Sequence, residues 1–201
     1  MSRALPAIAA AALLAAPAVA AGYGFDADYS GAPVPAIRTL DVQINPEVVR
    51  EARAIAPRST TRGQQYIDPR DADDLIEDLR EELAAELGSA GVYSTTAPGP
   101  AGTLVVTINE ATPSNPAHTE VGGRQNLDFR SAGRGGATMT ATLLAPDGAT
   151  VADYTYRWEE SSFDVSTAPR IGWMGAERAF DRFSSRLARE LSDQRSGSPS
   201  S

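Results

Sequence analysis

Cysteine and lysine are absent from the 201-residue sequence, and histidine occurs only once, as His118. Without cysteine the chain has no disulfide, no thiol nucleophile, no thiolate metal ligand and no cysteine to carry a lipid. One histidine cannot supply the several ligands that a zinc site normally needs. A Ser-His-Asp triad would have to use His118, yet no Gly-x-Ser-x-Gly motif is present. We therefore expect no metal, no cofactor and no enzymatic activity, although a catalytic pair of carboxylates stays open.

The absence of lysine leaves arginine as the basic residue at all 18 basic positions. Together with the abundant alanine, glycine and proline, this composition is typical of a bacterium with GC-rich DNA. The 26 acidic residues outnumber the arginines, and the formal net charge is −8. Because a negative field repels nucleic acid and anionic lipid head groups, we expect no nucleic-acid partner.

Residues 1–20 have the three parts of a secretory signal peptide. Arg3 provides a short positive region, residues 7–16 form an apolar core, and Ala18-Val19-Ala20 fits the small-residue cleavage rule. An uncleaved membrane anchor that extends to about Ala21 is the alternative. Cleavage removes one arginine and no acid, which leaves 17 − 26 = −9 charges and no membrane span. The expected location is the periplasm or the medium of a Gram-negative type of bacterium.

The rest of the chain divides into three parts. A flexible leader is expected at 21–35, a single α+β domain at 36–193 and a disordered tail at 194–201. Glycine and proline in the leader disfavour regular structure. The leader nevertheless contains three aromatic residues, Tyr23, Phe25 and Tyr29. Their presence leaves open a second role for the leader, as a docking segment for a partner.

A β-hairpin at Thr138–Trp158 is the clearest local prediction. Apolar and polar residues alternate along both halves, and Pro146-Asp147-Gly148 between them has the composition of a tight turn. The threonines of the first half are expected to face water. The aromatic residues of the second half are expected to lie inside, namely Tyr154, Tyr156 and Trp158.

Two more strands and two helices complete the expected domain. The strands are Ile37–Ile44 and Thr103–Asn109, and a short strand near Leu127 and Phe129 would be a fifth. The helices are Asp68–Leu87 and Pro169–Asp193, each with one apolar stripe. We predict an α+β fold in which an antiparallel sheet of about four to five strands carries both amphipathic helices on one face.

Two regions are candidates for binding. The loop at 118–136 is rich in glycine and carries Arg124, Arg130 and Arg134, whose guanidinium groups suit an anion. The other interpretation of this loop is that its glycines merely serve turns. Trp173 and Met174 lie beside Gly172 and Gly175, where they either pack on the sheet or contact a partner.

Three segments resemble small uncharacterised bacterial periplasmic lipoproteins and, more distantly, auxiliary lipoproteins of envelope transport and assembly systems. They are Leu104-Val-Val-Thr-Ile, Leu144-Ala-Pro-Asp-Gly-Ala-Thr-Val and Ala179-Phe-Asp-Arg-Phe-Ser-Ser-Arg-Leu-Ala-Arg-Glu-Leu. The resemblance covers about Ile37 to Asp193 and implies a β-α-β-β-β-α envelope domain. This chain departs from the lipoproteins in lacking the lipidated cysteine, and no functional residue is carried over.

Three functions are considered. The leading one is a non-enzymatic periplasmic envelope protein that binds a partner, such as another envelope protein, as an accessory domain. The second is a small anion- or ligand-binding protein that uses the Gly/Arg-rich loop. The third is a hydrolase. The sequence does not distinguish oligomeric states.

Overall fold

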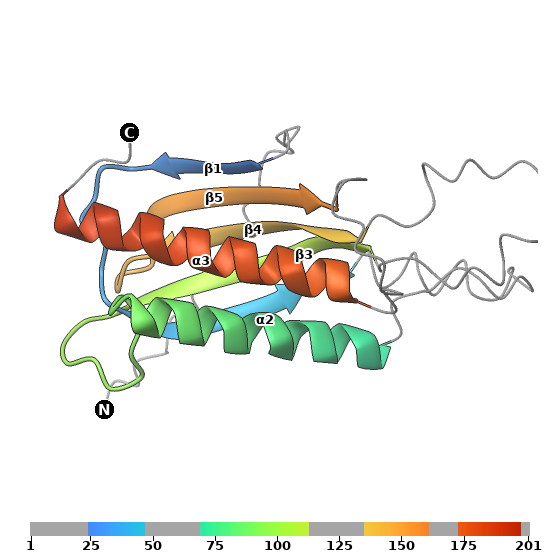
Figure 1. The fold of residues 1–201 in the computed structure, drawn as a ribbon. Helices are drawn as coiled ribbons and strands as arrows, with labels where there is room; N and C mark the ends of the chain where they lie inside the picture. The colour runs from blue at the N-terminus through green and yellow to red at the C-terminus, as the bar shows by residue number, and fades with distance from the viewer. Residues whose placement is uncertain (1–23, 47–68, 113–134, 161–172, 198–201) are drawn as a thin grey trace, which may run out of the picture.

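The computed structural model describes residues 24–46, 69–112, 135–160 and 173–197. Several sequence predictions lie outside these residues: the signal peptide, the strand near Leu127 and the three arginines of the Gly/Arg-rich loop. The described elements form one sheet with two helices (Figure 1). They are, in chain order, β1 (Gly24–Tyr29), β2 (Ile37–Ile44), α2 (Pro69–Ser89), β3 (Gly102–Thr112), β4 (Gly136–Leu144), β5 (Thr150–Glu159) and α3 (Met174–Ser196).

The sheet has the strand order β1-β5-β4-β3-β2. The predicted α+β class is confirmed, but the prediction of a purely antiparallel sheet is wrong, because β2 pairs with β3 in parallel. The helix α2 lies between these two strands in the sequence. A crossover through a helix returns the chain to the same end of the sheet, so neighbouring strands joined in this way run parallel.

The predicted hairpin is confirmed as β4 and β5, which pair antiparallel. Its turn has the expected chemistry. The N–H of Gly148 donates to the carbonyl of Ala145 at 2.9 Å, and Asp147 Oδ1 accepts from the N–H of Ala149 at 3.0 Å. Gly148 has φ of 86°, a value that glycine adopts without steric cost.

The prediction of a flexible leader at 21–35 is wrong for Gly24–Tyr29, which form β1. This strand pairs antiparallel with β5 along its whole length, from Gly24 opposite Arg157 to Tyr29 opposite Ala152. Phe25, Ala27 and Tyr29 are half-buried and alternate with exposed residues. The strand forms because its apolar side chains complete the core.

At the other end of the chain, the disordered tail predicted at 194–201 is wrong for Gln194–Ser196. These residues are the last turn of α3, which ends at Gly197 in the left-handed conformation. The N–H of Gly197 donates to backbone carbonyls of this turn, which is a common helix C-terminal cap.

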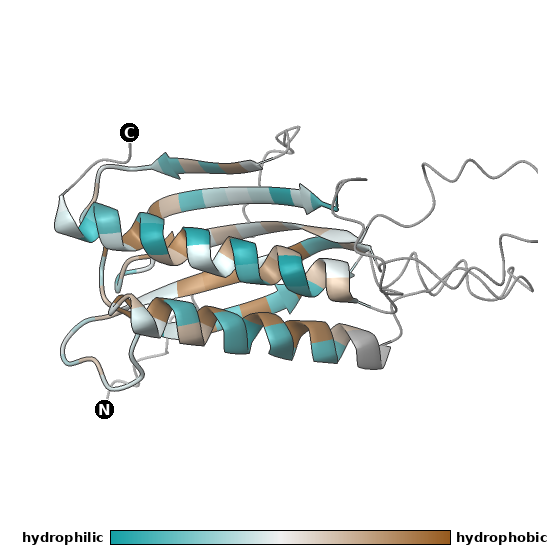
Figure 2. Ribbon diagram, in the orientation of Figure 1, coloured by the Kyte–Doolittle hydropathy of each residue, from teal (hydrophilic) through white to brown (hydrophobic). Residues whose placement is uncertain are grey.

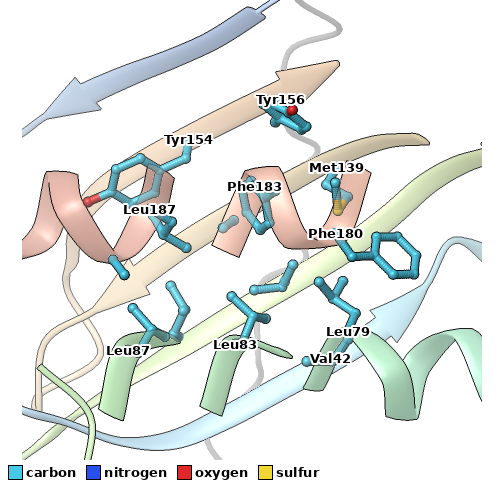
Figure 3. Close-up of a cluster of buried hydrophobic side chains, with 14 of the residues drawn as sticks. Val42, Leu79, Leu83, Leu87, Met139, Tyr154, Tyr156, Phe180, Phe183 and Leu187 are labelled. Carbon is cyan, nitrogen blue, oxygen red and sulfur yellow. The ribbon is translucent and has the colours of Figure 1, made fainter. Parts of the chain in front are cut away.

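Both helices cover the same face of the sheet, and the core lies between the two layers (Figures 1 and 2). The apolar sides of α2 and α3 face the strands, as their predicted stripes require. Figure 3 shows the side chains that meet there. They include Leu79, Leu83 and Leu87 from α2, Phe180, Phe183 and Leu187 from α3, and Val42, Met139, Tyr154 and Tyr156 from the strands.

An aromatic cluster forms where β1, β5 and α3 meet. Phe183 lies with its ring centroid 5.6 Å from that of Tyr156 and 6.4 Å from that of Phe25. Tyr29 contacts Tyr154 edge to face, with ring centroids 5.8 Å apart. The hydroxyl of Tyr154 donates to that of Tyr29 at 3.3 Å, which donates to Glu190 Oε1 at 3.2 Å. These contacts fasten the edge strand to the core.

Alkaline pH is expected to destabilise the fold through this cluster. Burial raises the pKa of Tyr154 from 10.0 to about 12, and burial also raises the pKa of Tyr29. The folded state therefore favours the neutral phenol of Tyr154. Its contribution is complete below pH 10 and is lost as the pH rises to about 12, by roughly 2–3 kcal/mol.

Denaturant titrations at several alkaline pH values, followed together with tyrosinate absorbance, measure this loss. Tyr154→Phe is expected to reduce the alkaline loss of stability, whereas Tyr93→Phe, outside the cluster, is expected to retain it. If the free energy of unfolding fell equally with rising pH in Tyr154→Phe and in the wild type, the alkaline loss of stability would not come from ionisation of Tyr154.

Candidate functional site: the face of the sheet opposite the helices

The face of the sheet opposite the helices is covered by neither described helix. Along the two central strands, fully buried residues alternate with partly exposed ones, as in Leu104 and Val105 or Met139 and Thr140. The partly exposed set is mostly threonine, which confirms that the threonines of β4 face solvent. We call this surface the open face. It comprises Asp26, Asp28, Thr39, Asp41, Gln43, Thr103, Val105, Thr107, Asn109, Glu110, Thr138, Thr140, Thr142, Leu144, Asp153, Thr155, Arg157 and Glu159.

The strand register aligns these residues in rows that cross the sheet. One row contains Asp28, Asp153, Thr142, Val105 and Asp41, each opposite the next on the neighbouring strand. Carboxylates therefore stand at both ends of the row, with a threonine and a valine between them. We call it the carboxylate row.

The next row is uncharged apart from its first member. It runs from Asp26 through Thr155, Thr140 and Thr107 to Gln43. The two rows place hydroxyl groups side by side across the centre of the open face. A threonine hydroxyl can both donate and accept a hydrogen bond, so this area suits a polar chain.

Hydrogen bonds between side chains hold polar residues of the open face in place. Thr142 Oγ1 donates to Asp153 Oδ1 at 2.6 Å, and Gln43 Nε2 donates to Thr107 Oγ1 at 3.1 Å. Each bond joins neighbouring strands. The surface is therefore organised before any partner is bound.

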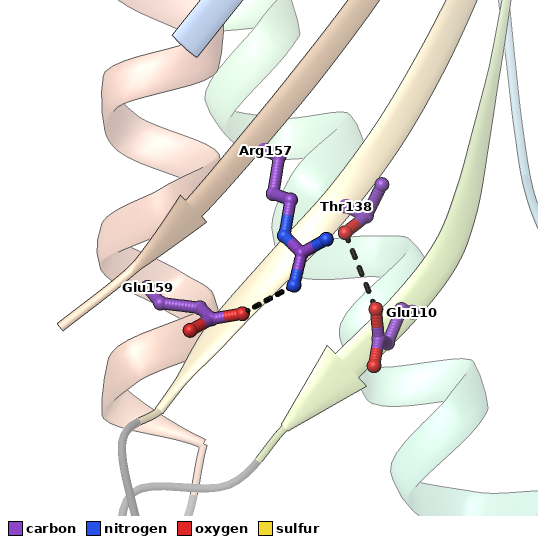
Figure 4. A network of polar contacts seen from close by, with 4 residues as sticks. All are labelled: Glu110, Thr138, Arg157 and Glu159. Atoms are coloured by element: carbon purple, nitrogen blue, oxygen red, sulfur yellow. Dashed lines mark hydrogen bonds and ion pairs between the residues drawn. The ribbon is translucent and has the colours of Figure 1, made fainter. Parts of the chain in front are cut away.

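A second polar group lies at the end of the open face where β3 and β5 end and β4 begins (Figure 4). Arg157 forms an ion pair with Glu159, with an N–O distance of 2.8 Å. Thr138 Oγ1 lies 3.4 Å from Glu110 Oε2. The one arginine of the open face thus has an acidic neighbour on its own strand.

The open face carries a net negative charge. The open face has one guanidinium, that of Arg157, and six carboxylates, so its formal charge is 1 − 6 = −5. The acidic residues are Asp26, Asp28, Asp41, Glu110, Asp153 and Glu159. Asp28 lies directly opposite Asp153. Like charges in this position destabilise a sheet, so folding alone does not account for the pair.

Within residues 24–46, 69–112, 135–160 and 173–197, no group of three or more His, Cys, Asp or Glu residues could hold a metal ion. The chemistry available on the open face is hydrogen bonding and charge. Such an arrangement can recognise a partner through hydrogen bonds and ion pairs.

The residues predicted as binding sites have different outcomes. Arg124, Arg130 and Arg134 lie outside the described residues, so the anion site stays a prediction. Trp173 is half-buried against the core, and its carbonyl accepts the N–H of Glu177 at 2.9 Å. Met174 next to it is 37% exposed. Trp173 is thus partly buried and Met174 is exposed, and their role in binding a partner stays a prediction.

The sequence prediction missed the acidic end of the open face. Asp26 and Asp28 belong to a segment interpreted as a leader, although Phe25, Ala27 and Tyr29 alternate with them at the period of a strand. That alternation is the signal that could have revealed β1. Among the helices of the described part, none is both long enough and apolar enough to cross a membrane.

No family model matches the sequence, and no curated protein matches it. Two solved structures of PelC from Paraburkholderia phytofirmans are similar to the chain. A dodecamer of a single-substitution variant has a TM-score of 0.43 and 13% identity, and the match covers 84% of this chain and 95% of that chain. The PelC dodecamer in another crystal form has a TM-score of 0.42 and 12% identity, with 80% and 96% covered. A similarity of this size carries no conclusion about what the present chain binds.

Proposed function

We propose that the chain is an exported, non-enzymatic accessory domain of the bacterial cell envelope, and that it binds a protein partner through the open face. The observation that carries this proposal is the polar surface that spans all five strands opposite the helices. The features of residues 1–20 that favour a signal peptide support an envelope location.

The charges of the open face support binding more than catalysis. A carboxylate that acts as a general acid normally lies in an apolar pocket that raises its pKa. Asp26, Asp28, Asp41 and Asp153 are instead exposed on a surface of threonines. Exposed and hydrogen-bonded carboxylates provide complementarity to a partner and speed its approach.

Site-specific photocrosslinking in the living cell tests the proposal. A photoreactive amino acid replaces Thr107 or Thr140 on the open face, and in matched controls it replaces Asp78 or Glu81 on the exposed side of α2. We expect a discrete crosslinked product, identified by mass spectrometry, from the open-face positions alone. Products of equal yield from both sets, or none from either, would contradict binding through this surface.

A further inference from the structure

We infer that the segment bound by the open face is an extended, arginine- or lysine-rich stretch of a partner protein that lies across the strands. This inference rests on the proposed function and specifies the chemistry of the partner. It starts from the formal charge of −5 on the open face and from the positions of its acids in the carboxylate row.

Asp28 and Asp153 of the open face lie directly opposite each other, where folding does not favour two like charges. Aspartate is depleted in strands, yet β1 has two aspartates among six residues, and one of them faces Asp153. Acidic residues near the start of α2 need no such explanation, because they complement the positive end of a helix and face water. A cation bound between Asp28 and Asp153 would offset the repulsion of this pair, so the energetic gain from a basic partner is concentrated on the sheet.

The spacing of the carboxylate row sets the spacing of basic residues in the partner. Strands lie about 4.8 Å apart, and Asp153 is three strands from Asp41, which gives about 14 Å between them. An extended chain advances about 3.3 Å per residue, so basic side chains about four positions apart reach both ends. The part of the segment between the two basic residues would lie over Thr142 and Val105. The hydroxyls of Thr140 and Thr107, in the neighbouring row, would then be available to its backbone as hydrogen-bond partners.

A labelled synthetic peptide with two arginines about four positions apart, joined by glycine and serine, is the probe. Its affinity for the purified protein is measured by fluorescence anisotropy. The test variant combines Asp28→Asn, Asp41→Asn and Asp153→Asn. The matched control combines Asp73→Asn, Asp74→Asn and Asp78→Asn on α2, which changes the net charge by the same amount.

We expect the open-face variant to weaken binding about tenfold and the α2 variant to change it less than about twofold. A peptide whose two arginines are adjacent is expected to bind more weakly than the spaced peptide. Circular dichroism and thermal unfolding of both variants verify that they are folded, and the measured affinity of each folded variant then decides the inference.

Equal weakening by the two variants would show an effect of net charge alone and would overturn the inference. It would also be overturned if the wild type failed to bind the spaced peptide, or if labelled protein bound a second copy of the chain through the open face. Crosslinking at Thr107 and Thr140 to a partner without basic segments would retain the proposed function and reject only the basic segment.

Discussion

Phe183→Ala is expected to lower the free energy of unfolding by about 4 kcal/mol. Phe183 lies on the buried side of α3 with no exposed surface, and its ring contacts those of Phe25 and Tyr156. Truncation removes the contacts of an aromatic ring and leaves a cavity that elements on three sides cannot fill by a small shift. Urea denaturation followed by circular dichroism measures the change.

Ser184→Ala is the matched control, because Ser184 is the next residue of the same helix and is also fully buried. The Ser184 hydroxyl has no hydrogen-bond partner in the described part of the chain. Since a buried hydroxyl without a partner costs free energy, its removal is expected to leave stability unchanged or raise it by up to about 1 kcal/mol. Equal losses for the two variants would mean that the Phe183 ring does not pack as described.

The double variant Phe25→Ala, Tyr29→Ala is expected to lower the free energy of unfolding by about 4 kcal/mol as well. The ring of Phe25 contacts those of Tyr154 and Phe183, and the guanidinium carbon of Arg186 lies over it, 5.4 Å from the ring centroid. The variant removes these contacts. Tyr29 loses its contacts with Tyr154 and Glu190. Thermal and urea unfolding measure the loss.

Asp28→Ala is the control for this double variant. Asp28 lies on the same strand with its side chain on the open face, opposite Asp153. Its removal relieves a like-charge contact, so stability is expected to stay the same or rise slightly. If the double variant were as stable as Asp28→Ala, residues 24–29 would behave as the flexible leader predicted from the sequence.

Local patterns in the sequence were sufficient for the hairpin and for both helices. The turn at Pro146-Asp147-Gly148 forms bonds within a few residues, and the leucines of α2 repeat at helical spacing. The predicted burial of Tyr154 and Tyr156 is confirmed. Trp158 is only half-buried, and the guanidinium carbon of Arg182 lies 5.0 Å from its ring centroid.

Pairings between distant segments were harder to predict. The element order β2-α2-β3 contained the signal for a parallel pair, because a helix connects the strands. The strand β1 has only six residues and two glycine or alanine positions, which disfavour a strand by themselves. Its partner β5 is far along the sequence, so only the tertiary structure stabilises it.

The sequence prediction placed the binding residues in the loop at 118–136 and at Trp173 and Met174, and for the open face it gave only the orientation of the threonines. The alternating threonines of β4 indicated a face toward water, which the structure confirms. The carboxylate row could not be predicted in the same way, because its three carboxylates come from β1, β2 and β5 and are aligned only through the register of the whole sheet.

The position of β1 at the edge of β5 has a consequence for the order of folding. Tyr29 and Tyr154, which are joined by their hydroxyls, are 125 residues apart in the sequence. During synthesis β1 emerges first, yet it cannot pair until β5 follows, and contacts so distant in sequence form slowly. We expect β2 to β5 and the helices to assemble before β1 docks. Until then β5 is an unprotected edge strand, so the growing chain is most prone to pair with other chains just before its first strand closes the sheet.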